Sequence, residues 1–553
     1  MAVYYDFINL SLSSSSSRGS RSSSGSYKWV VLSNTTIGVL MASIDSSIVI
    51  ISLPYILKSV LLHTPGGTSL PTSPLYAIAT ADSFSYIMWA LLGYMLITAT
   101  LLLLFGRLAD LKGRVKIYNL GFAIFTVGSL LTGLSAIIIP NYLVTEGVQI
   151  IGFRLLQAIG AAMLWSNSAA LLTDAFPSNQ RGLALGTNMV AGIGGGILGL
   201  VLGGIITSVT SWRFIFFINV PIGAFGTAWA YLRLKELSQR KPGETLDVPG
   251  AVFLSGAIAS LLLSATFYTM GDMVSSVSSG IFYTMFHPYL LYSEIAFIAF
   301  PVLLLLFAVN EIYWAEHPLM KLSLFKRRMF ASGVAASSLI AIGRGGIMFL
   351  LVFYYEGVKG LSAFHAGLDL IPMSLGFLLV GPLSGALSDK IGYRGLTLAG
   401  AVLSAVAVAL LSALPQDAGV LTVSGVLALA GIGGGLFGSP NIASIMGSVE
   451  PEVRGVGAAT NSTLTNIASM LALTVAFVFI GTTVNMSNFI TLFIGTTKDL
   501  PSAIVQSAAY QNQWVSFMRA FHSVFLIFAI MVALAIIPSL LRPKHVDLKS
   551  GAS

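Results

Sequence analysis

The sequence GRLADLKGR, residues 106–114, has a counterpart later in this 553-residue chain, GALSDKIGYR at residues 385–394. The copies share four positions at one spacing, 279 residues apart: Gly106, Leu108, Asp110 and Gly113, then Gly385, Leu387, Asp389 and Gly392. A second pattern, Arg-Gly-x-x-x-x-Thr-Asn, begins at Arg181 and again at Arg454, an offset of 273 residues. Two independent pairs at nearly one offset indicate a duplicated chain.

The chain around these copies is too apolar to fold in water. Hydrophobic residues make up 55% and charged residues 9%, whereas a soluble domain carries roughly 25% charged residues. A soluble enzyme, a nucleic-acid-binding module and a disordered scaffold are therefore excluded. Segments of about 20 apolar residues can cross the bilayer, and fourteen occur: 29–54, 77–104, 115–138, 147–172, 183–207, 213–232, 248–269, 289–310, 330–354, 366–388, 395–414, 419–446, 455–481 and 517–541.

Fourteen helices and the duplication together predict an all-α membrane protein with two six-helix halves and two inserted helices. We divide the chain into a Ser-rich tail that we expect to be disordered, an N-terminal half, the inserted pair, a C-terminal half and a second tail: residues 1–27, 28–241, 242–325, 326–541 and 542–553. An insertion of an even number of helices leaves the two halves in the same orientation.

The basic residues predict the orientation. Of 29 lysines and arginines, 22 lie on the side of the termini, five on the opposite side, and Arg154 and Arg344 inside helices. Basic loops stay in the cytoplasm, so we predict a protein of the cell membrane with both termini cytoplasmic. The net charge of +8 is then a topology signal, and the partner is the lipid bilayer, not nucleic acid. With no cysteine and no histidines at ligand spacing, we expect neither metal nor cofactor.

Parallel six-helix halves with these loops resemble the major facilitator superfamily over residues 29–541. In that family the loop is a conformational latch and not a substrate contact. The resemblance therefore implies a latch made of Gly106, Asp110, Gly113, Arg114, Gly385, Asp389 and Gly392, with Arg181 and Arg454 in the related loops.

Helix motifs resemble the fourteen-helix drug/proton antiporter branch of that family. Asp45 precedes Pro54 by nine residues in the first helix, Arg154 opens the fourth-helix motif, and WRFIFFINVPIG (residues 212–223) enters the sixth helix. The resemblance associates the fourth-helix arginine with proton coupling. The fifth helix departs from the antiporter motif, because Leu200 replaces its proline while the packing glycines remain: Gly195, Gly199, Gly203 and Gly204.

Charges inside the spans are costly, so each is a candidate for function. Asp45 lies about 13 Å from one end of its helix, and Arg154 lies about 12 Å from the same side. Desolvation and a nearby guanidinium move a carboxyl pKa in opposite directions, so we predict that Asp45 carries the proton and Arg154 tunes it. The alternative is a permanently ionised pair that joins the first and fourth helices.

The resemblance places the first, fourth, ninth and twelfth helices around a central cavity. Arg344 lies about 18 Å from the end of the ninth helix, near the midplane, so this cavity could hold Asp45, Arg154 and Arg344. The candidate substrate contacts are Gln157, Trp165, Asn167, Arg344 and Asp369, although packing explains the first three equally well. Glu146 lies near a helix end, where solvated positions are usual.

We predict a secondary active transporter, a monomer that exports drug-like or small organic compounds against protons by alternating access. The first alternative is a carrier of a specific metabolite, an anionic one included, coupled to protons or not. Leu200 and the surplus of arginine favour it. A non-transporting receptor or lipid-handling protein is a remote alternative, since a static protein has no use for two latches. We expect no enzyme, because no triad, metal cluster or cofactor loop occurs.

Overall fold

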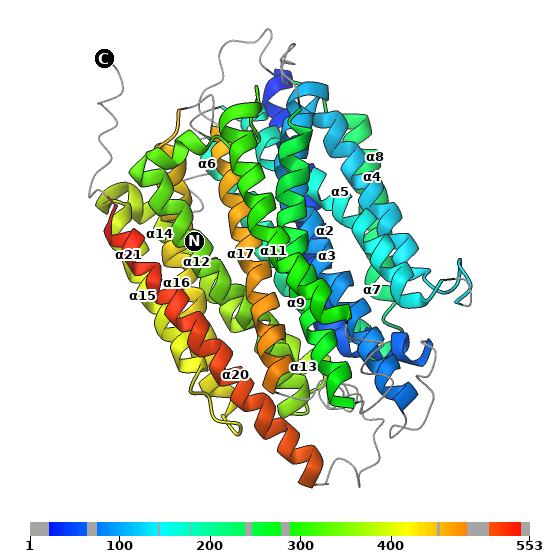
Figure 1. Cartoon of the computed structure of the whole chain (residues 1–553). Helices are drawn as coiled ribbons and strands as arrows, with labels where there is room; N and C mark the ends of the chain where they lie inside the picture. Colours follow the sequence, from blue (N-terminus) through cyan, green and yellow to red (C-terminus); the bar gives the residue numbers. More distant parts are fainter. Residues whose placement is uncertain are drawn as a thin grey trace.

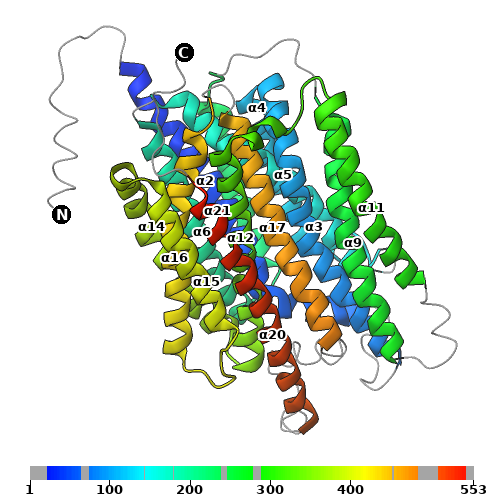
Figure 2. The same cartoon turned by 60° about the vertical axis from the view of Figure 1, so that its left-hand side comes forward.

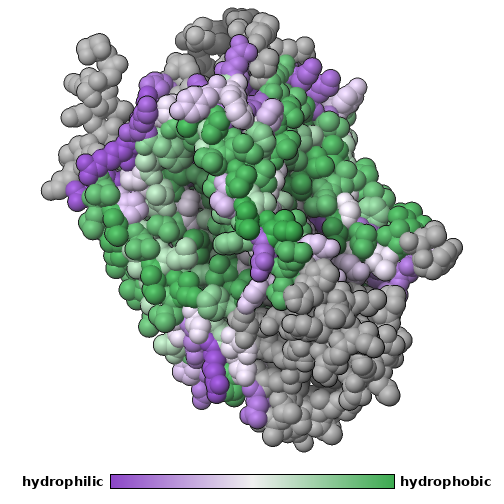
Figure 3. Space-filling view, in the orientation of Figure 1, coloured by the Kyte–Doolittle hydropathy of each residue, from purple (hydrophilic) through white to green (hydrophobic). Residues whose placement is uncertain are grey.

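The structure is a computed structural model that describes residues 22–63, 74–141, 144–177, 180–237, 246–277, 288–450, 454–483 and 508–542. Within these residues, 14 helices are long and apolar enough to cross a membrane, and they stand together in one bundle (Figure 1). The visible face carries a broad apolar band, with polar residues above it and near its lower edge (Figure 3). The prediction of fourteen spanning helices is confirmed.

The N-terminal half supplies six spans: α2 (Ser22–His63), α3 (Pro74–Lys112), α4 (Arg114–Gly133), α5 (Glu146–Ala175), α6 (Arg181–Val209), and α7 (Phe214–Phe217) with α8 (Asn219–Arg233). The inserted spans are α9 (Val248–Val277) and α11 (Pro288–Val309), which continues as η2 (Asn310–Trp314). After η3 (Leu322–Lys326), the C-terminal half supplies α12 (Arg328–Phe353) with η4 (Tyr354–Val358), α13 (Ala363–Asp369) with α14 (Ile371–Ile391), α15 (Tyr393–Leu411), α16 (Val420–Gly447), α17 (Arg454–Thr483), and α20 (Ala508–Leu534) with α21 (Ile536–Leu540).

The first helix is longer at both ends than predicted. It begins at Ser22, so residues 22–27 of the expected disordered tail are helical, and it continues nine residues past Pro54. Spanning helices tolerate proline because neighbouring groups satisfy the backbone that it frees. Residues 1–21 of that tail lie outside the described residues.

The predicted C-terminal tail begins with an anchored residue. The Arg542 side chain is buried and donates hydrogen bonds to Asn441 Oδ1 and to Ser444 Oγ on α16. Burial lowers the pKa of Arg542 to about 10, which leaves the guanidinium charged at neutral pH. The rest of the tail, residues 543–553, lies outside the described residues.

The two halves repeat the same packing. In the N-terminal half α2 packs against α6, α3 and α4 pack against α5, and α4 packs against α8. The equivalent pairs in the C-terminal half are α12 with α17, α14 and α15 with α16, and α15 with α20. The repeated loops also match, because Gly113 and Gly392 precede α4 and α15 with φ of +107° and +86°. Only glycine adopts such a backbone without strain, so the repeat seen in the sequence is a repeat of structure.

The inserted helices lie beside the junction of the halves. Figure 1 shows α9 and α11 together at the front of the bundle, and Figure 2 shows them at its right-hand edge. α9 contacts both α3 and α17. Because the number of spans is even, both ends of the described chain lie at one end of the bundle, which we call the terminal end. The opposite end, where α2 reaches His63 and α5 begins at Glu146, is the far end.

The two halves are in close backbone contact at the far end. A Cβ atom built on Gly204 of α6 would lie 2.5 Å from the Cα atom of Phe364 in α13. A Cβ atom on Gly367 of α13 would lie 2.8 Å from the carbonyl oxygen of Leu200 in α6. Small residues are what allows spanning helices to approach so closely. The structure is therefore closed between α6 and α13 at the far end.

Candidate functional site

Asp45 lies at the centre of a hydrogen-bonded cluster inside the N-terminal half. Its Oδ2 atom accepts a hydrogen bond of 2.7 Å from Arg154 Nη1. Its Oδ1 atom accepts bonds from Gln157 Nε2 at 2.8 Å and from Asn219 Nδ2 at 2.9 Å. Each of these contacts points a donor at Asp45, so the arrangement suits a carboxylate and not a carboxylic acid.

The partners of Asp45 are themselves held by neighbouring helices. Arg154 Nη1 also donates to Gln157 Oε1 at 2.8 Å, and the guanidinium carbon lies 4.1 Å from the centre of the Tyr94 ring on α3. Asn219, the first residue of α8, donates to Ser129 Oγ of α4 at 3.1 Å. Five spans of one half thus contribute to the cluster around Asp45, either directly or through its partners. Arg154 Nε and Nη2 are buried without a hydrogen-bond partner, so the guanidinium is not fully satisfied.

The position of this cluster corrects one prediction. Asp45 and Arg154 were expected to face the central cavity, but their side chains are 0% and 1% exposed and lie within the N-terminal half. The match in depth along the two helices holds, since the two residues form an ion pair. Depth along a helix does not fix direction around it, and Asp45 points toward α5 and α8. The next residue, Ser46, is the exposed one.

The other predicted substrate contacts are not brought together. Gln157 belongs to the buried cluster, and Asn167 is buried with its amide bonded to Met163 O one turn back on its own helix. Trp165 is 37% exposed. Arg344 is exposed on α12, and Asp369 is half-buried at the far end of the tenth span. Trp165 and Arg344 therefore remain candidates for contact with substrate, whereas Gln157 and Asn167 are too deeply buried for that role.

Sequence reasoning missed Asn219 and Tyr94 as members of the cluster. Asn219 lies inside the quoted sixth-helix motif, so its presence there was a usable signal. Tyr94 gave none, because an aromatic residue in a spanning helix looks like ordinary core. A buried aromatic ring against a guanidinium becomes recognisable only when the two helices are placed side by side.

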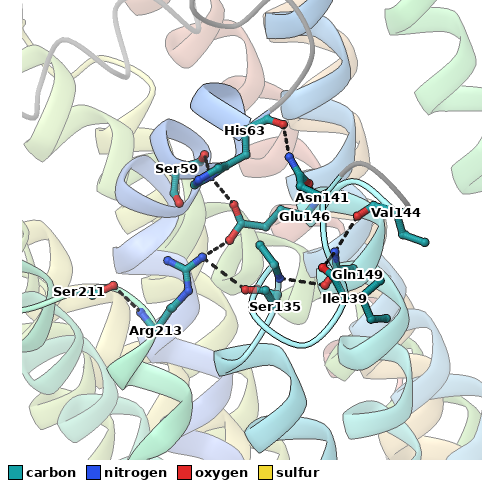
Figure 4. Close-up of polar contacts among 11 residues, drawn as sticks. Ser59, His63, Ser135, Ile139, Asn141, Val144, Glu146, Gln149, Ser211 and Arg213 are labelled. Carbon is teal, nitrogen blue, oxygen red and sulfur yellow. Dashed lines mark hydrogen bonds and ion pairs between the residues drawn. The ribbon is translucent and has the colours of Figure 1, made fainter.

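A second ionic cluster ties the far end of the same half together (Figure 4). Glu146 at the start of α5 is buried, pairs with Arg213, and lies 2.7 Å from His63 Nδ1 at the end of α2. Its backbone N–H donates to Asn141 Oδ1 at 2.6 Å. The expectation of a solvated Glu146 is therefore wrong, because His63 at the end of the first span and Arg213 at the start of the sixth span both contact its carboxylate.

The latch loop joins three parts of the N-terminal half. Arg114 Nε donates to Asp110 Oδ1 at 2.9 Å, and Arg114 Nη1 lies 2.7 Å from both carboxylate oxygens of Asp174 at the end of α5. Glu236, after α8, accepts a 3.0 Å bond from the N–H of Val115. These contacts stay within one half, so in this conformer they do not tie the two halves together.

The second latch is described only in part. Gly385 lies in α14, and Gly392 ends it in the same left-handed conformation as Gly113. The side chains of Asp389, Arg181 and Arg454 lie outside the described residues. The roles of these residues stay predictions.

We expect Asp110→Asn to slow transport without weakening substrate binding, because Asp110 holds Arg114 and contacts no cavity-lining residue. This ion pair is half-buried at the surface, where such a pair is worth up to about 1 kcal/mol, so the expected loss of turnover is about fivefold. Turnover in liposomes and equilibrium binding to the purified protein measure the two effects. Lys116→Gln, which removes an exposed charge two residues past Arg114, should change neither. A large loss of affinity in Asp110→Asn at unchanged turnover would contradict the latch.

The glycines of the fifth-helix motif pack α6 against α2. Cβ atoms built on Gly195 and Gly199 would lie 2.7 Å and 2.5 Å from the carbonyl oxygens of Leu40 and Ile44, and a Cβ atom on Gly203 would meet the side chain of Ile51. Gly204, one residue on, faces α13 of the other half. α6 runs without interruption through Leu200, which is buried. The glycines of this motif therefore allow α6 to pack closely against α2 on one side and against α13 on the other.

Two equivalent six-helix halves that enclose buried charges and meet through a glycine contact are the architecture of a multi-pass membrane transporter. The chain matches the family model of the Major Facilitator Superfamily over residues 35–473 and belongs to that superfamily. No group of three or more His, Cys, Asp or Glu side chains that could hold a metal ion occurs among the described residues.

Characterised relatives include transporters of different compounds. The riboflavin transporter RibZ of Clostridioides difficile (strain 630) is 31% identical over 445 residues, which cover 80% of this chain and 86% of that protein. Multidrug resistance protein 3 of Bacillus subtilis (strain 168) is 29% identical over 455 residues, 81% and 79% of the two chains. The crystal structure of a D-xylose-proton symporter is similar with a TM-score of 0.57 at 15% identity, covering 95% of this chain and 99% of that one. That likeness concerns the fold alone.

Proposed function

We propose that the protein is a proton-coupled exporter of small organic compounds in which Asp45 binds the transported proton. The observation that carries the proposal is the sealed carboxylate, to which Arg154, Gln157 and Asn219 all donate. The multidrug and riboflavin transporters to which the chain is similar support the transport of organic compounds. We further propose that the protein acts as a monomer in the cell membrane with its terminal end cytoplasmic, as the basic loops predict.

Coupling follows from the hydrogen bonds of Asp45. A carboxylic acid carries its own O–H, which needs an acceptor, whereas the groups that face Asp45 are all donors, so a bound proton is favoured only when this set of contacts rearranges. The donors stand on α5 and α8, and Asp45 stands on α2. Protonation is therefore linked to movement among these helices, and a rearrangement that opens them to water admits the proton. A buried carboxylate that lost a donor without gaining a proton would be unfavourable.

A carrier of one specific metabolite remains the second candidate. The similarity to a riboflavin transporter supports it, as does the absence of the antiporter proline at Leu200. The two candidates share the same fold and differ in the breadth of the substrates and in coupling.

Liposomes that contain the purified protein test the proposal. With an acidic lumen, an antiporter accumulates substrate in the lumen as protons leave, whereas a symporter needs an alkaline lumen. We expect accumulation of at least one compound from a set of ethidium, riboflavin and organic carboxylates, and only with the acidic lumen. Accumulation with the alkaline lumen would point to symport. Substrate transport at a rate that does not depend on the pH gradient would overturn proton coupling.

A further inference from the structure

Arg344 is an exposed guanidinium halfway along an enclosed helix. The ninth span runs from Arg328 to Val358, and Arg344 lies 16 residues from its start and 14 from its end, so it stands at mid-depth. The glycines around it are packed: Gly343 and Gly346 lie against Val532 and Phe528 of α20, and Gly345 lies against Ser469 of α17. Arg344 therefore points in the direction that these contacts leave free.

That direction leads into the interior of the bundle. α12 packs against α15, α16, α17 and α20 of its own half and contacts α2 of the other half, so helices of both halves surround it. Figure 2 shows α12 with helices on either side of it. An exposed side chain on such a helix opens into a space inside the protein. Ser46 of α2, the helix of the N-terminal half that α12 contacts, is also exposed near the middle of its helix.

Among the described residues, no acid pairs with the guanidinium of Arg344. Neither a hydrogen bond nor an ion pair joins the side chain of Arg344 to any described residue. Asp45 and Glu146 are already paired with Arg154 and Arg213, and Glu356 on the same helix is twelve residues away, about 18 Å. A charge at mid-membrane depth is expensive to maintain, and Arg344 has no partner for its charge in the described part of the chain. A partner from outside the chain accounts for it.

We propose that the space beside Arg344 binds the anionic group of the transported compound, so that the substrates are organic anions, such as carboxylates, and not lipophilic cations. This inference rests on the proposed transport function and adds the charge of the substrate. A guanidinium is suited to the task because its planar set of donors matches a carboxylate in two parallel hydrogen bonds. The same charge repels a cation in a space of low dielectric constant.

Binding to the purified protein in detergent, without any pH gradient, tests the charge preference. The probes share a fluorescent pyrene body and differ only in charge: 1-pyrenebutyrate, its neutral amide and a pyrenebutyl trimethylammonium. We expect the carboxylate to bind at least tenfold more tightly than the other two. Arg344→Gln should abolish this preference, and Arg344→Lys should keep part of it. Arg519→Gln, which removes an exposed arginine from α20, is the matched control and should change nothing.

The Arg344→Gln protein should fold, because removing an unpaired charge leaves no other charge without a partner. Its melting temperature should equal or exceed that of the unmodified protein. Equal binding of the three probes, tighter binding of the cation, no binding of any, or a carboxylate preference that survives Arg344→Gln would each overturn the proposal. Asp45→Asn should retain the preference for the anion. If the unmodified protein prefers the anion but shows no proton-driven accumulation, the proposed function fails and this inference stands, whereas proton-driven accumulation without the preference for the anion has the opposite meaning.

Discussion

Replacing Asp45 by asparagine is expected to reduce accumulation driven by a pH gradient to the level of liposomes without protein. Asparagine has nearly the shape of aspartate but cannot titrate, so no proton is carried. Exchange of substrate down its own gradient should continue, because the binding space lies elsewhere. The folded protein should also become less stable, since Arg154 loses its partner in a buried site, a change that costs roughly 3–5 kcal/mol.

A double variant separates coupling from stability. Asp45→Asn with Arg154→Gln removes both charges, and replacing a buried pair together is often close to neutral, so the melting temperature should recover. If Asp45 carries the proton, the recovered protein still fails to couple. If the pair only joins helices, coupling returns with stability. Glu294→Gln, an acid exposed on α11, is the control and should couple normally.

The buried pair of Asp45 and Arg154 shows which features of the site could be predicted from the sequence and which could not. Charge within the spans singled out Asp45 and Arg154, and the rise per residue along a helix placed them at one depth, which the 2.7 Å ion pair confirms. The direction of Asp45 around α2 could not be predicted, because an apolar helix inside a bundle has no polar face that marks its orientation. Gln157 and Asn167 were for the same reason assigned to a cavity, although both are buried.

The fold could be predicted from the sequence more completely than the site could. Helix number, the duplication and the inserted pair follow from apolar length and from residues that recur at fixed spacing, and both are local properties of the chain. The ends of helices were less accessible, because α2 continues through Pro54 and hydropathy falls before the helix stops. Contacts such as Arg114 with Asp174, or Glu146 with Arg213, join segments 60 or more residues apart. Nothing in the spacing of the sequence marks such partners.

Replacing Gly204 by valine is expected to open the far end and to stop most transport. The atoms that a Cβ would meet, at 2.5–2.7 Å, are the backbone of Phe364 and Ala363, which cannot turn aside as a side chain could. The new side chain must therefore separate α6 from α13. Overpacking of this kind costs about 1–3 kcal/mol, which corresponds to a change of roughly 5–150-fold in the ratio of the closed and open conformers.

Because the chain has no cysteine, a single Leu200→Cys gives a direct probe of this contact. Leu200 is buried where α6 meets Gly367, so its reaction with a thiol reagent should be slow, and Gly204→Val should accelerate it as transport falls. Gly367→Val should act in the same way from the opposite helix. Gly194→Val makes the same change in α6 at a position whose Cβ would meet no atom within 4 Å, and it controls for the cost of valine in the helix. Wild-type turnover in Gly204→Val, or equal acceleration by Gly194→Val, would mean that closure between α6 and α13 is not part of the transport cycle.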